Sequence, residues 1–249
     1  MRDQNQVLLK LTGAAPHYSD MYVPQLTEDT RLSLRDAWCI GPPIVVSGLA
    51  TSASALSPYP LRTDAVYALE GDIVELFQPM VHPVAVWFFI TVYILVYACL
   101  LLSTYIGLKR EGRGRHVAYA TTYTVVILVS TPVFYFVPVG VTGYYLDGVE
   151  PLLYEFGAGI GSSMTTVDTL QKALPSLHTG LSLTASLYAP DGYRLLSWTA
   201  TALVVLSTLY LGIHWLVDLA AGGALAYACY RLTPAILRVL RTTEQRLRR

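Results

Sequence analysis

The chain has few charged residues for its length. Asp, Glu, Lys and Arg make up 14% of its 249 residues, whereas 53% are hydrophobic. The surface of a small soluble domain typically carries about 25–35% charged residues, so this composition excludes an ordinary water-facing surface. We expect a multi-pass protein of the cell membrane that is surrounded by the lipid bilayer. Nucleic acid is not expected as a partner.

Cysteine is scarce as well. The three cysteines, Cys39, Cys99 and Cys229, are far apart, and each lies in an apolar stretch. Their odd number and wide spacing indicate neither a disulfide framework nor a zinc cluster. We expect small buried side chains at these positions, and we expect the chain to need no metal ion or other cofactor.

Long apolar stretches are abundant. A helix needs about 20 apolar residues to cross the hydrocarbon core of a bilayer. Several stretches reach this length without a charged residue, and two shorter ones admit an ionisable residue at their leading end. The sequence therefore predicts an all-α integral membrane protein, a bundle of six transmembrane helices. The predicted spans are 37–56, 84–108, 118–139, 177–189, 195–213 and 216–230.

Basic residues set the predicted orientation of this bundle. Short cytoplasmic loops collect Lys and Arg, whereas translocated loops do not. The basic loop 109–115 and the basic tail after Arg231 are therefore predicted to be cytoplasmic. Because four spans separate these two segments, 140–176 and 213–217 are predicted to lie on the non-cytoplasmic face. We expect the active site at that edge of the membrane.

The chain divides into three predicted parts. These are a cytoplasmic N-terminal segment (1–36), a membrane catalytic domain (37–233) and a basic cytoplasmic tail (234–249). Within the second part, apolar residues recur at helical spacing between 64 and 77, opposite four acidic residues. This pattern favours an amphipathic helix on the outer membrane interface, with a solvated loop helix as the alternative.

Three ionisable residues are candidates for catalysis. His178, His214 and Asp218 lie at the outer ends of predicted spans, where ionisable groups are costly and therefore usually functional. If 214–218 is helical, Asp218 shares a face with His214 and can accept a hydrogen bond from one ring nitrogen. A histidine oriented in this way is a nucleophile or a base, and His178 is the natural proton donor.

Two motifs carry a resemblance to a known family. The Pro-Ser-Leu-His stretch at 175–178, and the spacing from Ser207 to His214 to Asp218, resemble motifs of the type 2 phosphatidic acid phosphatase (PAP2) superfamily. The resemblance closely covers the C-terminal third of the chain and, more loosely, the six-span layout. It implies that His214 becomes transiently phosphorylated, that Asp218 supports it, and that His178 protonates the leaving group.

The sequence also departs from the superfamily pattern. Thr208 stands where a phosphate-binding arginine is expected, Leu177 replaces a glycine, and no upstream motif of Lys, six residues and Arg-Pro is found. This form resembles the inositolphosphotransferase branch, similar to inositol phosphorylceramide synthase, which moves a headgroup phosphate between lipids. Phosphoryl transfer needs fixed positive charge. Lys172 is therefore the candidate phosphate-binding residue, together with Ser176 of the motif.

These features predict a membrane lipid phosphoesterase or phosphotransferase. Its substrate is a lipid phosphate or a phospholipid, and the phosphoryl or headgroup-phosphate passes to water, a polyol or a lipid alcohol. One alternative is a plain phosphatase for phosphatidate or an isoprenyl phosphate. A zinc enzyme that uses the same three residues as ligands is another. The last is a transporter with an outer His/Asp relay and no enzymatic activity.

Overall fold

The structure, a computed structural model, describes residues 34–112, 114–155, 161, 164–165 and 169–247. This part of the chain is helical, and its extended segments pair only in an isolated bridge between Val139 and Lys172. The all-α class is thereby confirmed. The predicted N-terminal segment 1–36 lies almost entirely outside the described residues. The elements are α2 (Leu34–Ala55), α3 (Thr63–Glu70), η2 (Ile73–Met80), α4 (Pro83–Thr91), η3 (Val92–Val96), α5 (Tyr97–Arg110), α6 (Arg115–Phe136), η4 (Thr142–Tyr144), α7 (Leu152–Glu155), α9 (Leu177–Tyr188), η5 (Asp191–Tyr193), α10 (Arg194–Tyr210) and α11 (Leu216–Leu247).

Two helices are long and apolar enough to cross a membrane. The first is the continuous helix Pro83–Arg110, made of α4, η3 and α5, and the second is α6. In α2 the apolar part, Cys39–Ala55, is shorter. The 12 residues of α9 extend about 18 Å, less than the thickness of the hydrocarbon core. Among the described residues, length and composition thus identify two candidate spans, and the six-span arrangement stays a prediction.

Each of the six predicted spans corresponds to one helix, with shifted ends. The helix α10 stops at Tyr210, short of the predicted end at 213, because Gly212 turns the chain with a φ of 69°. The helix α11 continues to Leu247 through Pro234. The tail predicted to begin at 234 is therefore a continuation of α11 over its described residues.

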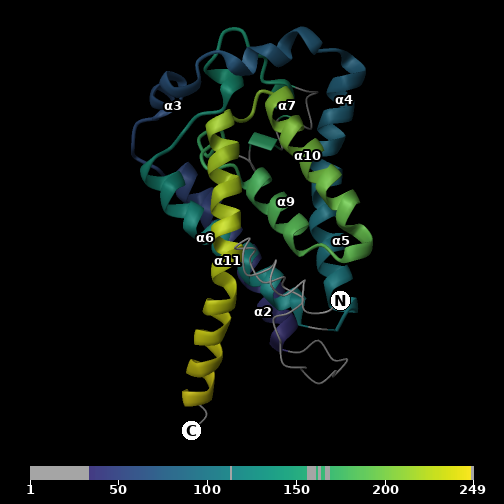
Figure 1. Cartoon of the computed structure of the whole chain (residues 1–249). Helices are drawn as coiled ribbons and strands as arrows, with labels where there is room; N and C mark the ends of the chain where they lie inside the picture. The colour runs from purple at the N-terminus through teal and green to yellow at the C-terminus, as the bar shows by residue number, and fades with distance from the viewer. Residues whose placement is uncertain (1–33, 113, 156–160, 162–163, 166–168, 248–249) are drawn as a thin grey trace, which may run out of the picture.

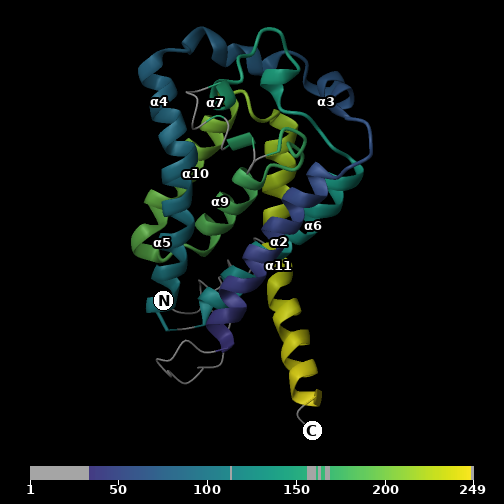
Figure 2. The same ribbon diagram turned by 180° about the vertical axis from the view of Figure 1, so that it is seen from behind.

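The helix α9 lies at the centre of the bundle. It packs against α5, α6, α10 and α11, while α2 lies against α6. Figures 1 and 2 show α3 and α7 at one end of the bundle and the C-terminus at the other. Small residues on α9, such as Gly180 and Ser182, are buried and allow its neighbours to approach closely. Two of the cysteines, Cys39 and Cys229, are buried as expected, but Cys99 is exposed.

The segment 64–77 differs from the single amphipathic helix that was predicted. It forms two short helices, α3 and the 3-10 helix η2, because Gly71 adopts a φ of 59° between them. Only part of the predicted apolar face is buried: Val66 and Val74 pack against the end of the bundle, whereas Leu69 and Leu76 are exposed. The break allows both short helices to lie across this end (Figure 1).

The start of α9 lies directly against the first turns of α11. The N–H of Ser176 donates to the backbone carbonyl of Asp218 at 3.0 Å. At Gly222, one turn further along α11, a Cβ atom would collide with the backbone carbonyl of Ser176. A Cβ at Gly180 of α9 would lie 3.2 Å from the carbonyl oxygen of Gly222. Glycine at these positions therefore brings the beginnings of the two helices together.

We expect Gly222→Ala to push the two helix starts apart, because the backbone carbonyl of Ser176 cannot rotate away as a flexible side chain could. Such overpacking costs about 1–3 kcal/mol of stability. Gly223→Ala is the matched control, since its Cβ would meet only side chains at 3.8 and 4.0 Å. Thermal unfolding in detergent compares the two variants. Equal melting temperatures would contradict the close approach of the helices.

Candidate active site

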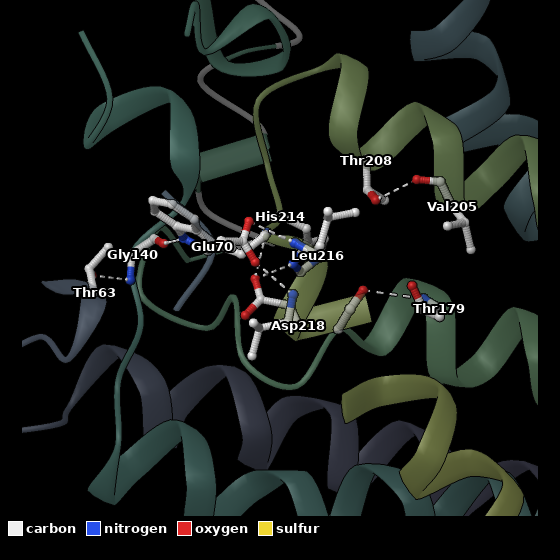
Figure 3. A network of polar contacts seen from close by, with 12 residues as sticks. Thr63, Glu70, Gly140, Thr179, Val205, Thr208, His214, Leu216 and Asp218 are labelled. Atoms are coloured by element: carbon white, nitrogen blue, oxygen red, sulfur yellow. Dashed lines mark hydrogen bonds and ion pairs between the residues drawn. The ribbon is translucent and has the colours of Figure 1, made fainter. Parts of the chain in front are cut away.

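The histidine and aspartate that are four residues apart meet through a helix cap rather than along a helix face. His214 precedes α11, which begins at Leu216, and Asp218 is the third residue of that helix. The Asp218 carboxylate turns back, so that its Oδ2 accepts the N–H of Trp215 at 2.9 Å and lies 3.3 Å from His214 Nδ1 (Figure 3). The contact predicted from the spacing is present, although 214–218 is not wholly helical. An acidic side chain at this position commonly binds the first N–H groups of a helix.

Burial strengthens the interaction between these two side chains. Asp218 is 0% exposed and His214 is 3% exposed. A carboxylate only accepts hydrogen bonds, so Nδ1 of His214 carries the proton and Nε2 keeps a lone pair. The second carboxylate oxygen, Oδ1 of Asp218, is buried with no hydrogen-bond partner among the described residues. A buried carboxylate beside the ring stabilises the positive charge that develops on the imidazole when Nε2 forms a bond.

A second carboxylate fixes the beginning of α11. The two carboxylate oxygens of Glu70, at the end of α3, accept the N–H groups of Leu216 at 3.0 Å and Val217 at 2.8 Å. Negative charge at this end of a helix is favourable, because the first N–H groups have no partner within the helix. Glu70 thereby holds the turn of helix from which Asp218 projects. Sequence reasoning missed this role, since the paired residues are about 146 positions apart in the chain.

The residue between His214 and α11 is anchored on three sides. Trp215 is fully buried, and its indole N–H donates to the carbonyl of Gly140 at 2.9 Å. Its ring packs against Tyr67 and Tyr145, with centroid distances of 6.4 and 5.7 Å. The Tyr145 hydroxyl donates to the carboxylate of Asp64, and this hydrogen bond raises the pKa of Tyr145. The loop that carries His214 is therefore held in one position.

Thr208 supports the same loop from α10. Its backbone carbonyl accepts the N–H groups of Ile213 at 3.0 Å and His214 at 3.3 Å. Its side chain is buried, and the hydroxyl donates to the carbonyl of Val205 in its own helix (Figure 3). Thr208, the residue at the position of the superfamily arginine, does not line the cavity described below.

The second histidine lies at the start of α9. Ser176 caps this helix, its hydroxyl accepting the N–H of Thr179 at 3.3 Å, and His178 is in the first turn. The ring centroids of His178 and His214 are 6.1 Å apart. The ring of Tyr93 stacks on His178 at a centroid distance of 4.2 Å, and Tyr97 packs against it at 4.7 Å.

Both histidines line one cavity of about 310 Å³. Lys172 also lines it, with its Nζ 3.4 Å from the Thr51 hydroxyl, and it is the one Lys or Arg among the described residues of the lining. Asp218 is buried behind His214 and does not reach the cavity. The cavity thus brings two histidines and one lysine to one space.

The two predicted phosphate-binding residues differ in their placement. Lys172 reaches the cavity, whereas Ser176 is buried, outside the cavity wall, and uses its hydroxyl as a helix cap. Arg62 is not among the residues that line the cavity. Phosphate binding by Lys172 and Ser176 stays a prediction, and the geometry favours Lys172.

The donor geometry does not favour a metal centre. Over the described ranges, no group of three or more His, Cys, Asp or Glu side chains is arranged to hold a metal ion. His214 turns Nδ1 toward Asp218. Two of the three ligands of the zinc alternative are therefore directed at each other.

Comparison with known proteins agrees with the motifs. The family model of the PAP2 superfamily matches residues 68–232, more than half of the chain, and this range contains His178, His214 and Asp218. No curated protein and no solved structure matches the chain significantly. Members of this superfamily are phosphatases and phosphotransferases that are usually membrane-bound, which supports a phosphatase-type enzyme in general terms. The chain belongs to the PAP2 superfamily.

Proposed function

We propose that the chain is a membrane-embedded phosphoesterase or phosphotransferase that cleaves a lipid phosphoester through a phosphohistidine at His214. The observation that carries this proposal is the buried 3.3 Å contact between His214 Nδ1 and Asp218 Oδ2, next to His178 on a shared cavity. A carboxylate that holds the Nδ1 proton leaves the Nε2 lone pair available for attack on phosphorus.

The two histidines take complementary parts in the proposed reaction. His214 Nε2 forms a bond to phosphorus while the bond from phosphorus to the leaving alcohol oxygen breaks. Protonated His178 donates its proton to that oxygen, so that a neutral alcohol leaves. Neutral His178 then accepts a proton from water or an alcohol, whose oxygen attacks phosphorus and breaks the bond to Nε2. Asp218 stabilises the positive charge on the His214 ring between these steps.

The proposed phosphate site contains little positive charge. Lys172 supplies one fixed cation on the cavity wall. The first N–H groups of a helix lack partners within the helix, and α9 begins at Leu177, which also lines the cavity. In this turn the Thr179 N–H is already bound by the Ser176 hydroxyl, and helix N–H groups carry only partial charge. A phosphodiester with one negative charge matches this site better than a phosphomonoester dianion, which needs about two cations.

The exposed side chains support a bilayer around the whole bundle. Large apolar residues are exposed on five of the long helices, including the shorter α2 and the less apolar α10 and α11. A surface of this kind is unusual for a protein in water. The basic ends of α5 and α11 lie away from α3 and α7 (Figure 1), which supports a six-span arrangement with a cytoplasmic C-terminus. Examples of the exposed residues are Ile44 on α2, Leu102 on α5, Leu128 on α6, Leu195 on α10 and Leu232 on α11.

The charge of the site predicts a preference for phosphodiesters with an alcohol acceptor. Purified protein is assayed on a phospholipid diester and on a lipid phosphomonoester with the same tails, each with and without inositol or glycerol. We expect faster turnover of the diester and product that carries the added alcohol.

The role of Lys172 is tested in the same assay. Lys172→Met should lower kcat/KM about tenfold or more, while Lys172→Arg should retain most of the wild-type kcat/KM.

Two results would change this proposal. Faster hydrolysis of the monoester than of any diester, with or without added alcohol, would favour the plain lipid phosphatase. Full activity of Lys172→Met on both substrates would remove Lys172 from the phosphate site.

The proposed orientation is tested by labelling single cysteines with an impermeant thiol reagent in intact cells. In a Cys99→Ala background, Cys39 and Cys229 are buried and should not react. Asp147→Cys lies in the exposed loop near α3, and Gly192→Cys lies between α9 and α10, where a Cβ meets no atom within 4 Å. We expect labelling at 147 in intact cells and labelling at 192 only after lysis. The reverse pattern would invert the proposed topology.

A further inference from the structure

The long helix Pro83–Arg110 changes its hydrogen-bond pattern beside the active site. Between α4 and α5, residues Val92–Val96 form a π-helical turn, and the N–H of Tyr97 donates to the carbonyl of Val92, five residues earlier. The turn contains neither proline nor glycine, so no residue with unusual backbone freedom accounts for it. A π-turn inside an α-helix adds one residue and changes which side chains face a neighbour, and such turns are frequent at functional sites.

The side chains that this turn presents to α9 are two tyrosines, and both contact His178. The ring of Tyr93 is stacked on the imidazole at a centroid distance of 4.2 Å and an interplanar angle of 30°. Tyr97, at the end of the turn, packs against the same imidazole at 4.7 Å and 47°. Both tyrosines also line the cavity that His178 and His214 share.

The Tyr93 ring is itself held firmly. It is 3% exposed and belongs to a buried cluster that includes Ile90, Leu153 and Tyr210. Tyr210, at the end of α10, is in turn fixed by its hydroxyl, which donates to the carbonyl of Met80 at 3.0 Å. A ring supported in this way restricts the ring stacked upon it. The plane of the His178 imidazole is therefore set by the π-turn.

An aromatic face also suits the charge state that the mechanism requires. A cation over the face of Tyr is attracted by the ring quadrupole, and the attraction increases where water is excluded. The proposed proton donor is the imidazolium form of His178, and the same cavity wall carries a like charge on Lys172. The two tyrosine rings supply a neutral group that holds the imidazolium without adding a competing carboxylate.

From these contacts we propose that Tyr93 and Tyr97 are positioning residues, presented by the π-turn Val92–Val96, that orient the His178 imidazole toward the leaving oxygen. This inference rests on the proposed function, because it assumes that His178 is the proton donor. Its consequence is specific: loss of the stacked ring should affect proton donation more than the attack by His214.

The test compares two leaving groups, because only a poor leaving group depends strongly on proton donation. The enzyme is assayed on a phospholipid diester, whose leaving group is an alkyl alcohol, and on an aryl phosphodiester of the same charge with an activated phenol. Because His178 is the base of the second step for both substrates, the first step is compared through kcat/KM. Tyr93→Leu should lower kcat/KM on the order of tenfold or more on the phospholipid, and less than about threefold on the aryl ester. Tyr93→Phe, which retains the ring, should keep the activity on both.

Tyr105→Leu is the matched control. Tyr105 lies further along the same helix, and its ring centroid is 6.1 Å from that of another histidine, His116. It belongs to a separate apolar cluster and does not line the cavity. This variant should leave the ratio of the two rates unchanged. Equal losses on both substrates in Tyr93→Leu, or no loss on either, would overturn the positioning role. Activity of Tyr93→Phe as low as that of Tyr93→Leu would assign the effect to the hydroxyl and overturn the stacking argument.

Failure of the proposed function has a different signature. His178→Ala should show the same selective loss on the phospholipid, and to a greater extent. If His178→Ala affects both substrates equally while wild-type protein is active, His178 is not the proton donor, and the proposed mechanism fails together with the inference. If His178→Ala is selective and Tyr93→Leu is not, only the positioning role is removed.

Discussion

The carboxylate of Asp218 holds together segments that are far apart in the sequence. The carboxylate oxygen Oδ2 contacts the His214 ring and accepts the N–H of Trp215. The backbone carbonyl of the same residue accepts the N–H of Ser176. One residue therefore fixes the loop after α10, the start of α11 and the start of α9. Oδ1 of this buried carboxylate has no partner within the described part of the chain, so its negative charge is costly unless a positive charge develops beside it. The rest of the site depends on this constraint, since His178 is carried on the helix start that Asp218 fixes.

Candidate residues that lie in short sequence motifs could be predicted from the sequence alone. The three candidate catalytic residues could be predicted because a His and an Asp four apart, and a Pro-Ser-Leu-His stretch, are short-range signals, and the family match contains them. The all-α class followed from apolar runs of helical length. The contact between His214 and Asp218 was predicted on the condition that 214–218 is helical. This condition is met only from Leu216 onward, because Gly212 ends the preceding helix and places His214 in the cap of the next one.

Other features depend on contacts between distant segments, which no local pattern reveals. Glu70 lies on the segment predicted to form an interfacial helix, yet its carboxylate caps α11. Tyr93 lies in a featureless apolar run, and only the π-turn brings it onto His178. The close approach at Gly222 is of the same kind, since glycine in a helix predicts no particular partner. In each example a contact between distant segments determines the geometry around the candidate catalytic residues.

The central claim, that Asp218 prepares His214 for covalent attack, is tested most directly by trapping the intermediate. Wild-type protein is mixed with a phospholipid labelled in its phosphate, denatured within the first turnover under alkaline conditions, and analysed by mass spectrometry of its peptides. The account predicts an acid-labile phosphoryl or headgroup-phosphate adduct on His214. Asp218→Asn should stay folded and lose about 10²–10⁴ in the rate of adduct formation. An adduct on another residue, or an unchanged rate in folded Asp218→Asn, would contradict the account.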